Sequence, residues 1–532
     1  MGKIYLLDCT LRDGGYVNNW QFGEDTIKGF GKKIAQTGIE IYEVGFIKGD
    51  RYDRNRAVFP NVESISEMIV PKSPDLMYVG MLDLSDPVPV ERILPYDGTS
   101  VDGLRVIFKK EKLEEAYHYC ERIKELGYTV FVQFVGTDCY SDKEFIEAIE
   151  KFNQLKPFAI SIVDSFGLIK RKQFLRLVYL ADNNLEKSIL LGYHAHNNLQ
   201  QAFGNAEALV ELNLQRDICI DACVFGMGRG AGNLNLELFA EYMNENFGTQ
   251  YRIEPMLEIM DEYLNEIYKD KFWGYSLPLY LSASSGCHPN YAIYLAEKDS
   301  LTVKSFYELL KEIPAGEKAN FSKNNAEQFY KEYQEKFIED RGALAELAGQ
   351  LAGREIMILA PGKSLTECKE GIEKLIEDRK PIVLAVNFTG ADYKTDFIFS
   401  SNMRRYIKIQ GCTQTPCIIT SNMKDATSYD YRVNFSSFSS EYPEIIDNSG
   451  LMALRLMLAI GVKKVFIAGM DGYAADRSKN YFDQLLEYDF SDVADNRNAM
   501  ISSEIRSISR RVNIKFVTPT NYTVSELAEL CS

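Results

Sequence analysis

The sequence predicts an α/β protein: an N-terminal (β/α)8 TIM barrel with a helical extension, followed by a C-terminal Rossmann-like α/β domain. Three observations support this prediction. Residues 1 to about 247 alternate short apolar runs with longer amphipathic segments, the strand pattern then disappears until residue 353, and a new strand–helix alternation begins at Glu355. Such alternation is typical of parallel strands joined by crossover helices. A chain of 532 residues is also too long for a single hydrophobic core.

Eight strand candidates precede residue 247, and each is short and apolar. They are residues 4–8, 41–46, 77–81, 103–108, 129–136, 159–164, 190–196 and 218–226. Helix-like segments between them carry apolar residues at three- and four-residue spacing, at 25–36, 112–126, 142–155, 172–183 and 199–212. Eight strand–helix units in roughly 250 residues match a (β/α)8 barrel, which we assign to residues 1–250.

The remaining chain divides into a helical part and a second α/β part. Residues 251–353 predict a helical extension and connector, with helices at 255–268, 305–313 and 324–351. Residues 354–532 predict the Rossmann-like domain, with strands at 355–360, 382–387, 397–400, 417–421, 464–469 and 514–517. Its first strand leads through a short turn into a helix expected at 366–377.

The composition excludes several classes of function. Sixty Lys and Arg against 76 Asp and Glu give a net charge of -16 without a visible basic patch, so we expect neither a nucleic acid polymer nor a membrane as partner. The N-terminal residues show no apolar run of signal-peptide length, which favours a cytoplasmic protein. The ten cysteines are widely spread, which argues against a disulfide framework or a zinc ribbon.

Candidate metal ligands lie at two predicted strand ends, because functional groups of a barrel gather where its strands end. The first strand runs into Asp13, and the seventh ends in His194 and His196. Side chains alternate along a strand, so two histidines two residues apart point to the same side. Two imidazoles and a carboxylate are a ligand set for a catalytic divalent metal with open positions. The alternative is a solvent-exposed strand end.

Five motifs carry a resemblance to a known superfamily. They are TLRDGG at 10–15, EVGF at 43–46, VDSFG at 163–167, HAHNN at 194–198 and GMGRGAGN at 226–233. In this order they resemble the metal-dependent aldolases, lyases and synthases that share a pyruvate-carboxyltransferase-type barrel. Within that superfamily the chain is most similar to the 4-hydroxy-2-oxovalerate aldolases, which form or cleave a bond between pyruvate and an aldehyde.

The resemblance implies a divalent metal cofactor, Mn²⁺ or Mg²⁺, with Asp13, His194 and His196 as ligands and Asn233 near the ion. It implies formation or cleavage of a carbon–carbon bond between a 2-oxo acid such as pyruvate and a carbonyl acceptor, through a metal-stabilised enolate. The expected partners are therefore small molecules, and we expect a homo-oligomer.

Three charged residues have supporting roles in this interpretation. Arg12 supplies a fixed positive charge to the developing enolate oxygen, or forms a structural ion pair at the barrel rim. Glu43 and Asp164 orient the metal ligands or Arg12.

The catalytic base stays open. In the 4-hydroxy-2-oxovalerate aldolases a histidine follows the Arg-Asp-Gly-Ser element, whereas Tyr16 holds that place here. Tyrosine has an ordinary pKa of about 10 and is a poor base at neutral pH, but it can be a general acid or hydrogen-bond donor. Either Tyr16 has a different role or His288 supplies the imidazole, with Tyr291 as a further catalytic candidate. His288 is otherwise a core or loop-capping histidine.

The second α/β domain carries a weaker signal. The turn after its first strand can expose backbone amides to a phosphate. With polar residues at later strand ends, this turn resembles the nucleotide-binding fold of the bacterial sialyltransferase-like and methylpterin-diphosphokinase-like families. The implied phosphate- or nucleotide-binding residues are Gly362, Lys363, Ser364, Asn387, Ser449, Gly450 and Asp471. The alternative is a scaffold or oligomerisation domain.

The sequence therefore predicts a metal-dependent aldolase, with a nucleotide-linked or sugar acceptor bound by the C-terminal domain. Three alternatives stay open: an acyl-CoA-dependent Claisen-type synthase or lyase on the same barrel, a glycosyl- or diphosphotransferase in the C-terminal domain as the main activity, and a non-enzymatic metal-binding scaffold.

Overall fold

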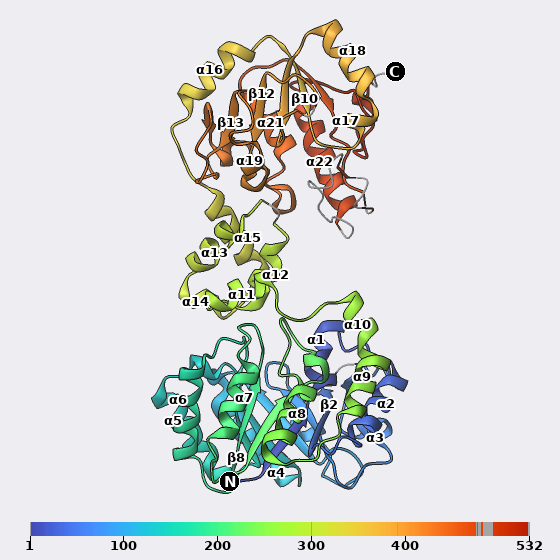
Figure 1. Ribbon diagram of the computed structural model, residues 1–532, viewed down its shortest axis with the longest axis vertical. Coiled ribbons are helices and arrows are strands. Elements are labelled where there is room, and N and C mark those ends of the chain that lie inside the picture. The colour runs from blue at the N-terminus through green and yellow to red at the C-terminus, as the bar shows by residue number, and fades with distance from the viewer. Residues whose placement is uncertain are drawn as a thin grey trace. The chain divides into compact units, whose positions relative to one another are not determined.

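The computed structural model describes residues 2–49, 51–298, 300–390, 392–474, 476, 480–481 and 493–529. The chain divides into two compact units between Ile293 and Tyr294, here called unit 1 and unit 2 (Figure 1). Helices of the predicted extension at 251–353 occur in both units. The proposed division into residues 1–250, 251–353 and 354–532 stays a prediction.

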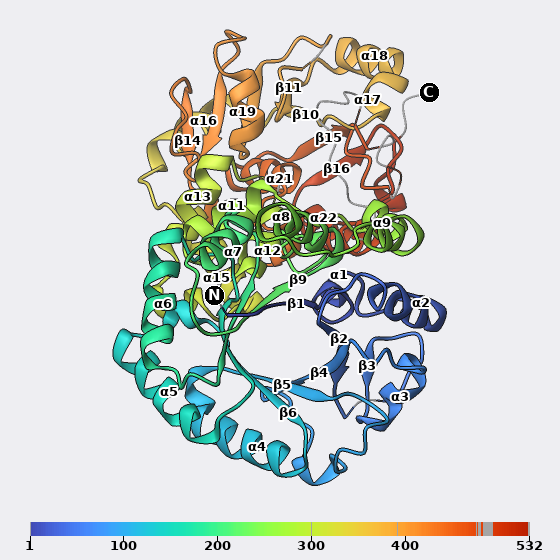
Figure 2. The same cartoon turned by 60° about the horizontal axis from the view of Figure 1, so that its bottom comes forward.

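Unit 1 contains a closed barrel, which confirms the predicted fold. Its sheet is parallel throughout, and β1 pairs with both β2 and β9, so the strands form a ring (Figure 2). The strands of the ring are β1 (Ile4–Asp8), β2 (Ile41–Ile47), β4 (Met77–Asp83), β5 (Gly103–Phe108), β6 (Thr129–Phe134), β7 (Ala159–Asp164), β8 (Leu190–Ala195) and β9 (Ile218–Ala222), and β3 (Val58–Phe59) extends the sheet beside β2.

Two barrel strands end earlier than the sequence predicts, because left-handed backbone follows them. Gly136 (φ 65°) lies just after β6, and Phe225 (φ 59°) lies in the turn after β9. The extended conformation cannot continue through such residues. His196 likewise lies one residue beyond β8 and forms an isolated bridge with Asn233.

Helices surround the ring and cover its outer side (Figure 2). The longer helices bury an apolar face, as α5 does with Phe145, Ile149 and Phe152, and Ser141 caps α5 with Glu144 in a capping box. The helices of unit 1 are α1 (Gly15–Asn18), α2 (Glu24–Ile34), α3 (Glu63–Ile69), α4 (Leu113–Glu125), α5 (Asp142–Leu155), α6 (Arg171–Asn184), α7 (Ala202–Glu211), α8 (Leu236–Phe247), α9 (Glu254–Ile259), α10 (Asn265–Asp270) and α11 (Leu277–Ser284); α12 (Pro289–Ala296) spans the division between the units.

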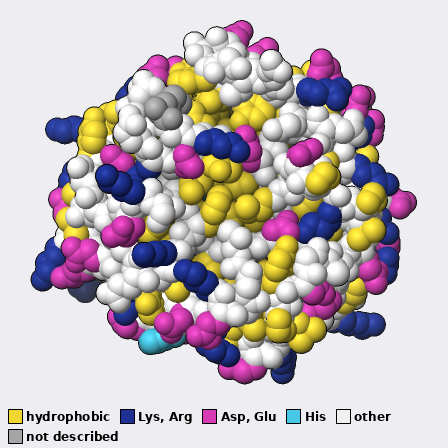
Figure 3. Space-filling model, turned by 90° about the horizontal axis from the view of Figure 1, so that it is seen from below, with side chains coloured by type: hydrophobic (Ala, Val, Ile, Leu, Met, Phe, Trp, Pro, Cys, Tyr) yellow, Lys and Arg dark blue, Asp and Glu magenta, His cyan; other side chains and the backbone are white. Residues whose placement is uncertain are grey.

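The barrel interior has an apolar layer and a charged layer. One buried cluster includes Leu7, Ile41, Phe131 and Cys219, with Tyr5 packed against it. On the surface seen from below, hydrophobic side chains gather near the middle among scattered charged ones (Figure 3). The charged layer is made by residues that follow or interrupt the same strands, and it forms the candidate site described below.

Unit 2 contains a parallel sheet of seven described strands in the order β14-β13-β12-β11-β10-β15-β16. The strands are β10 (Glu355–Leu359), β11 (Ile382–Val386), β12 (Phe397–Ser400), β13 (Cys417–Thr420), β14 (Tyr431–Val433), β15 (Lys464–Ala468) and β16 (Asn513–Phe516). The helices are α13 (Val303–Glu312), α14 (Ala315–Lys318), α15 (Lys323–Gln334), α16 (Arg341–Leu351), α17 (Ser364–Glu367), α18 (Lys369–Arg379), α19 (Met403–Ile409), α20 (Phe435–Phe438), α21 (Ser449–Ala459) and α22 (Ala494–Ser509).

Three predictions for unit 2 were wrong in detail. The strand β14 was missed because its three residues include Arg432 and form no apolar run. The single helix expected at 324–351 is interrupted between α15 and α16. There the Asn434 side-chain amide accepts a hydrogen bond from the N–H of Ile338 and donates one to its C=O, which competes with helical hydrogen bonds. The helix expected at 366–377 is divided at Cys368, whose backbone is not helical.

None of the helices in the described part of the chain has both the length and the apolar character that crossing a bilayer requires.

Candidate functional site

Three potential metal ligands meet at the carboxyl ends of β1 and β8. After β1 the chain forms a π-helical turn, Thr10–Gly14, which carries Asp13. His194 lies on β8 and His196 just beyond it, so alternation along the strand turns both imidazoles inward. Asp13 Oδ2 lies 3.5 Å from His194 Nε2, and Asp13 Oδ1 lies 4.0 Å from His196 Nδ1. These three residues can each offer one ligand atom within 4.8 Å of the others.

The donor set and its surroundings fit a divalent metal ion. All three side chains are buried, and among the described residues His196 Nδ1 and Asn233 Oδ1 have no hydrogen-bond partner. Burial lowers the pKa of His196 to about 4, so its imidazole is neutral, whereas Asp13 and Asp221 outweigh burial and raise the pKa of His194, which a metal ion would have to deprotonate. Asn233 donates to Asp13 Oδ1 at 2.9 Å and thereby fixes the carboxylate. Two imidazoles and a carboxylate suit Mn²⁺, Fe²⁺ or Zn²⁺, and Mg²⁺ less well.

Arg12 links this group to a buried carboxylate. Its guanidinium donates to Asp13 and, from Nε, to Glu43 Oε2 at 2.7 Å. Burial acts to raise the pKa of Asp13, but Arg12 and both histidines outweigh it and hold that pKa well below its ordinary value. Arg12 and Asp13 therefore face each other as a charged pair, and Glu43 holds the other side of the guanidinium.

Two residues of this charged layer were missed by the sequence analysis. Arg105 on β5 forms ion pairs with Glu43 at 3.0 Å and with Asp221, and Asp221 on β9 approaches His194 Nδ1 at 3.0 Å. The signal was present in the sequence, because each of these charges interrupts an apolar strand. A charge inside a buried strand requires a partner of opposite sign.

Asp164 lies at the carboxyl end of β7 and contacts the loop that follows it. Both of its oxygens accept backbone N–H groups of the following loop, from Leu168 at 2.8 Å and from Ile169 at 3.0 Å. The carboxylate thereby shapes the loop after β7, and the carbonyl oxygen of Asp164 accepts the N–H of the potential ligand His196 at 3.2 Å. The expected role of Asp164 in orienting the metal ligands or Arg12 stays a prediction.

The candidates for proton transfer gather around Arg229, which lies in the glycine-rich loop after β9. Arg229 lies over the Tyr16 ring, 5.7 Å from its centroid, and its Nη2 lies 3.0 Å from His288 Nε2. The pKa of His288 is lowered to about 4, mainly by burial and to a smaller extent by the positive charge of Arg229. Burial and Asp13 raise the pKa of Tyr16. Tyr291 is fully buried, as is typical of a packing residue. Sequence reasoning had given Arg229 no role.

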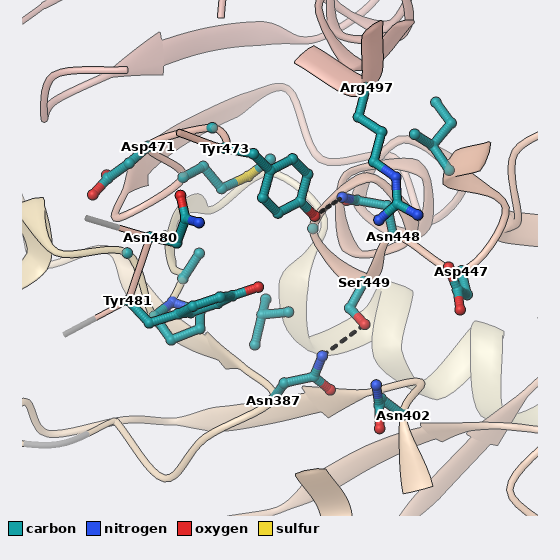
Figure 4. A pocket seen from close by; sticks show the side chains of 18 of the residues that line it. Asn387, Asn402, Asp447, Asn448, Ser449, Asp471, Tyr473, Asn480, Tyr481 and Arg497 are labelled. Carbon is teal, nitrogen blue, oxygen red and sulfur yellow. Dashed lines mark hydrogen bonds between the residues drawn. The ribbon is translucent and has the colours of Figure 1, made fainter. Parts of the chain in front are cut away.

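A second candidate site lies in unit 2, where the strand order reverses. The strand β10 has β11 on one side and β15 on the other, and a crevice at the carboxyl edge beside such a reversal is where open parallel sheets bind ligands. A pocket opens at this edge (Figure 4). Its lining includes Asn387 after β11, Asn402 after β12, Tyr473 after β15, and the start of α21; Arg497 extends into it from α22.

The predicted phosphate-binding residues divide into two groups. Gly362, Asn387, Ser449, Gly450 and Asp471 line the pocket, whereas Lys363 is exposed and Ser364 is buried outside the lining. The N–H of Ser364 donates to Asp471 Oδ2 at 2.7 Å and its hydroxyl donates to Oδ1. The Asp471 carboxylate thus occupies the place where the turn after β10 was expected to hold a phosphate.

Charged side chains such as Lys298, Arg405 and Asp447 also line the pocket, and beside them neutral groups form a hydrogen-bonded network. Asn387 Nδ2 donates to Ser449 Oγ at 2.7 Å, and Ser400 Oγ donates to Asn387 Oδ1 at 2.8 Å. Asn448 donates to the Tyr473 hydroxyl at 3.3 Å (Figure 4). The turn after β10 and the turn after β15 approach each other closely, since a Cβ on Gly362 would lie 2.3 Å from the carbonyl oxygen of Gly469.

Comparison with known proteins gives matches that centre on the barrel. Residues 96–260 match the family model described as HMGL-like. The chain is 23% identical over 283 residues to a 4-hydroxy-2-oxovalerate aldolase of Desulfitobacterium hafniense, covering 50% of this chain and 79% of that protein. It is 24% identical over 246 residues to an oxaloacetate decarboxylase of Mycobacterium tuberculosis, covering 44% of this chain and 67% of that protein.

Among solved structures, the HMG-CoA lyase of Brucella melitensis is similar at 15% identity, with a TM-score of 0.39, over 49% of this chain and 96% of that one.

Proposed function

We propose that unit 1 is a divalent-metal-dependent carbon–carbon lyase of the aldolase type, which joins or cleaves a 2-oxo acid such as pyruvate and a carbonyl compound. The observation that carries this proposal is the group of Asp13, His194 and His196 at the barrel's carboxyl edge, with Arg12 against it. The HMGL-like match and relatives named as aldolases and as a decarboxylase of a 2-oxo acid support it.

Each side chain then has a role that its contacts support. Asp13, His194 and His196 would hold Mn²⁺ or Mg²⁺, a Lewis acid that polarises the keto oxygen of a 2-oxo acid. Arg12, fixed by Glu43, supplies positive charge where negative charge develops on that oxygen as a proton leaves the neighbouring carbon. Tyr16 stays protonated at neutral pH because its pKa is raised, so it is a hydrogen-bond donor.

His288 is the remaining imidazole of this region and the proposed proton acceptor. Its lowered pKa keeps the ring uncharged at neutral pH, and Arg229, which contacts His288 Nε2 at 3.0 Å, also lies over the Tyr16 ring. His288→Ala should therefore slow proton removal from the donor carbon and leave Mn²⁺ binding unchanged. Equal rates in His288→Ala and the wild type would assign the base elsewhere.

The test is exchange of deuterium into the methyl group of pyruvate, followed by NMR with Mn²⁺ or Mg²⁺ present. Exchange should require the metal, stop on addition of a chelator, and be lost in His194→Ala. His118→Ala is the matched control, since His118 is an exposed histidine on α4. Exchange that survives His194→Ala would contradict the proposal.

Other outcomes would support the alternatives. Exchange into acetyl-CoA in place of pyruvate would favour an acyl-CoA-dependent Claisen-type enzyme. Tight Mn²⁺ binding without exchange into either donor would favour a metal-binding scaffold.

A second proposal concerns unit 2: its pocket binds a nucleotide or a nucleotide-linked sugar, which serves as the acceptor. The position at the strand-order reversal supports this, together with Arg497 and the amides around it, because a guanidinium and amide groups suit phosphate and a base or sugar. Titration calorimetry with nucleoside mono- and diphosphates and nucleotide sugars tests it.

Arg497→Met should weaken nucleotide binding and raise the KM for the acceptor while pyruvate exchange stays unchanged. Arg506→Met is the matched control, since Arg506 lies on the same helix and pairs with Glu526 at 3.2 Å. Transfer of a glycosyl or diphosphate group without any barrel substrate would instead make unit 2 the main catalyst. No heat of binding with any nucleotide would contradict the proposal.

A further inference from the structure

The proposed metal group rests on a chain of buried ion pairs. From Arg12 the contacts run to Glu43 at 2.7 Å, from Glu43 to Arg105 at 3.0 Å, and from Arg105 to Asp221. From Asp221 they continue to His194 Nδ1 at 3.0 Å, which is itself one of the three potential ligands. Arg105 is 1% exposed and Asp221 2% exposed, so water does not screen these charges.

The two nitrogens of His194 face different carboxylates. Nε2 lies 3.5 Å from Asp13 Oδ2, on the side of the metal group, and Nδ1 lies 3.0 Å from Asp221 Oδ2. A metal ion bound between Asp13 and His196 would take the lone pair of Nε2, and the ring proton would then lie on Nδ1, where the nearer carboxylate of Asp221 can accept it. The same contact fixes the rotation of the ring.

We infer that Asp221 is a positioning residue of the metal centre: it keeps the proton of His194 on Nδ1 and directs the Nε2 lone pair toward the space between Asp13 and His196. Arg105 holds Asp221 in place and joins it through Glu43 to Arg12. The ligand and the proposed electrophilic arginine are thereby fixed by one buried structure. This inference rests on the proposed metal site but does not depend on which substrate the barrel takes.

A direct role for Asp221 as a ligand of a second metal fits the contacts less well. Cys9, His194 and Asp221 also offer ligand atoms within 4.8 Å of one another. However, Asp221 Oδ2 is already shared by Arg105 and His194. The Cys9 thiol points to the carbonyl oxygen of Ala222 at 3.4 Å, and its burial raises its pKa, which disfavours the thiolate that a metal needs.

The test compares two isosteric substitutions of buried aspartates in the full chain, Asp221→Asn and Asp8→Asn. Asp8 is as buried as Asp221, but its oxygens accept from the backbone N–H and the hydroxyl of Thr10. Free Mn²⁺ is measured by electron paramagnetic resonance during titration, which needs no substrate. Asp221→Asn should weaken Mn²⁺ binding about 10- to 100-fold, as loss of a carboxylate behind a metal-bound histidine does. Asp8→Asn should stay within about 2-fold of the wild type.

A second measurement uses the wild type alone and does not require a variant to fold. The chain has four histidines, so long-range ¹H–¹⁵N spectra of the Mg²⁺-saturated protein can be assigned, with His194→Ala identifying one ring. His194 should carry its proton on Nδ1. A proton on Nε2, or equal Mn²⁺ affinity in Asp221→Asn and the wild type, would overturn the inference.

The outcomes separate this inference from the proposed function. A wild-type chain that binds no Mn²⁺ would overturn the metal site itself and the inference with it. Wild-type binding that requires Asp221, without pyruvate exchange, would uphold the inference and contradict the proposed function. Equal weakening in Asp221→Asn and Asp8→Asn would show a general effect of buried charge and would also overturn the inference.

Discussion

The barrel interior of unit 1 and the pocket of unit 2 both bury polar side chains, but with different chemistry. In the barrel, Asp13, Arg12, Glu43, Arg105 and Asp221 form successive ion pairs, and all are nearly inaccessible to solvent. In the pocket, Asn, Ser and Tyr side chains bond one another. A buried charge without its partner costs several kcal/mol, whereas a lost neutral hydrogen bond costs about 1 kcal/mol. The barrel site therefore tolerates substitution far less than this network of neutral side chains in the pocket.

The largest effect is expected for Glu43→Gln, because Arg12 and Arg105 both lose the same counter-charge. We expect the free energy of unfolding of unit 1 to fall by about 3–5 kcal/mol. Both tryptophans, Trp20 and Trp273, lie in unit 1, so tryptophan fluorescence in urea follows that unit.

The control for Glu43→Gln is Glu147→Gln, which changes an exposed carboxylate on α5 that lies 3.6 Å from Lys143. Exposed ion pairs contribute little, so this variant should unfold nearly as the wild type does. A similar loss in both variants would contradict the contrast between buried and exposed charge.

Metal addition should stabilise one unit and leave the other unchanged. An ion that binds only the folded barrel at about 100 times its dissociation constant adds about 2.7 kcal/mol to the free energy of unfolding. Mn²⁺ should therefore shift the fluorescence transition of unit 1, and a chelator should reverse the shift. His196→Ala should remove most of this gain, since it deletes a potential ligand. An equal gain in that variant would place the ion elsewhere.

The sequence predicted the barrel strands and the three potential metal ligands, because apolar runs and strand ends are local features. It did not predict Arg105 and Asp221, the buried charges that pair behind those ligands. Arg105 and Asp221 lie 116 positions apart and meet only because β5 and β9 face each other across the barrel. Their pairing depends on closure of the ring, which no local pattern records.

The turn after β10 shows the opposite case, in which a local sequence pattern suggested a binding site and a distant residue changed it. Its Gly-Lys-Ser sequence suggested a phosphate loop, but Asp471, 107 positions after Ser364, accepts the hydrogen bonds that a phosphate would have accepted. The fold of the sheet was predictable from its apolar runs. The side chains that line its crevice come from loops that are distant in the sequence and meet only in the folded unit.

In the pocket, a change at Asn387 should have a smaller effect than the charge changes in the barrel. Asn387 has a left-handed backbone (φ 64°), which costs most residues other than Gly, Asn and Asp about 1–2 kcal/mol. Asn387→Ala adds this strain to the loss of the bonds to Ser400 and Ser449, so we expect a loss of about 2 kcal/mol in unit 2. Asn387→Gly should lose about half of that, as followed by circular dichroism. Equal losses would show that strain does not contribute.

The smallest effect is expected for Ser141→Ala at the start of α5, outside the barrel interior. The Ser141 hydroxyl accepts the N–H of Glu144, and the Glu144 carboxylate accepts the N–H of Ser141, so the substitution removes one half of a capping box. Such changes cost about 1 kcal/mol. Mn²⁺ affinity should not change, because in the part of the chain that the structure describes the contacts of the capping box do not include the charged layer. If affinity falls with stability here, the dependence on Asp221 would reflect a weakened barrel. Unchanged affinity would mean that Mn²⁺ binding depends on the orientation of the ligands and that small losses of barrel stability do not weaken it.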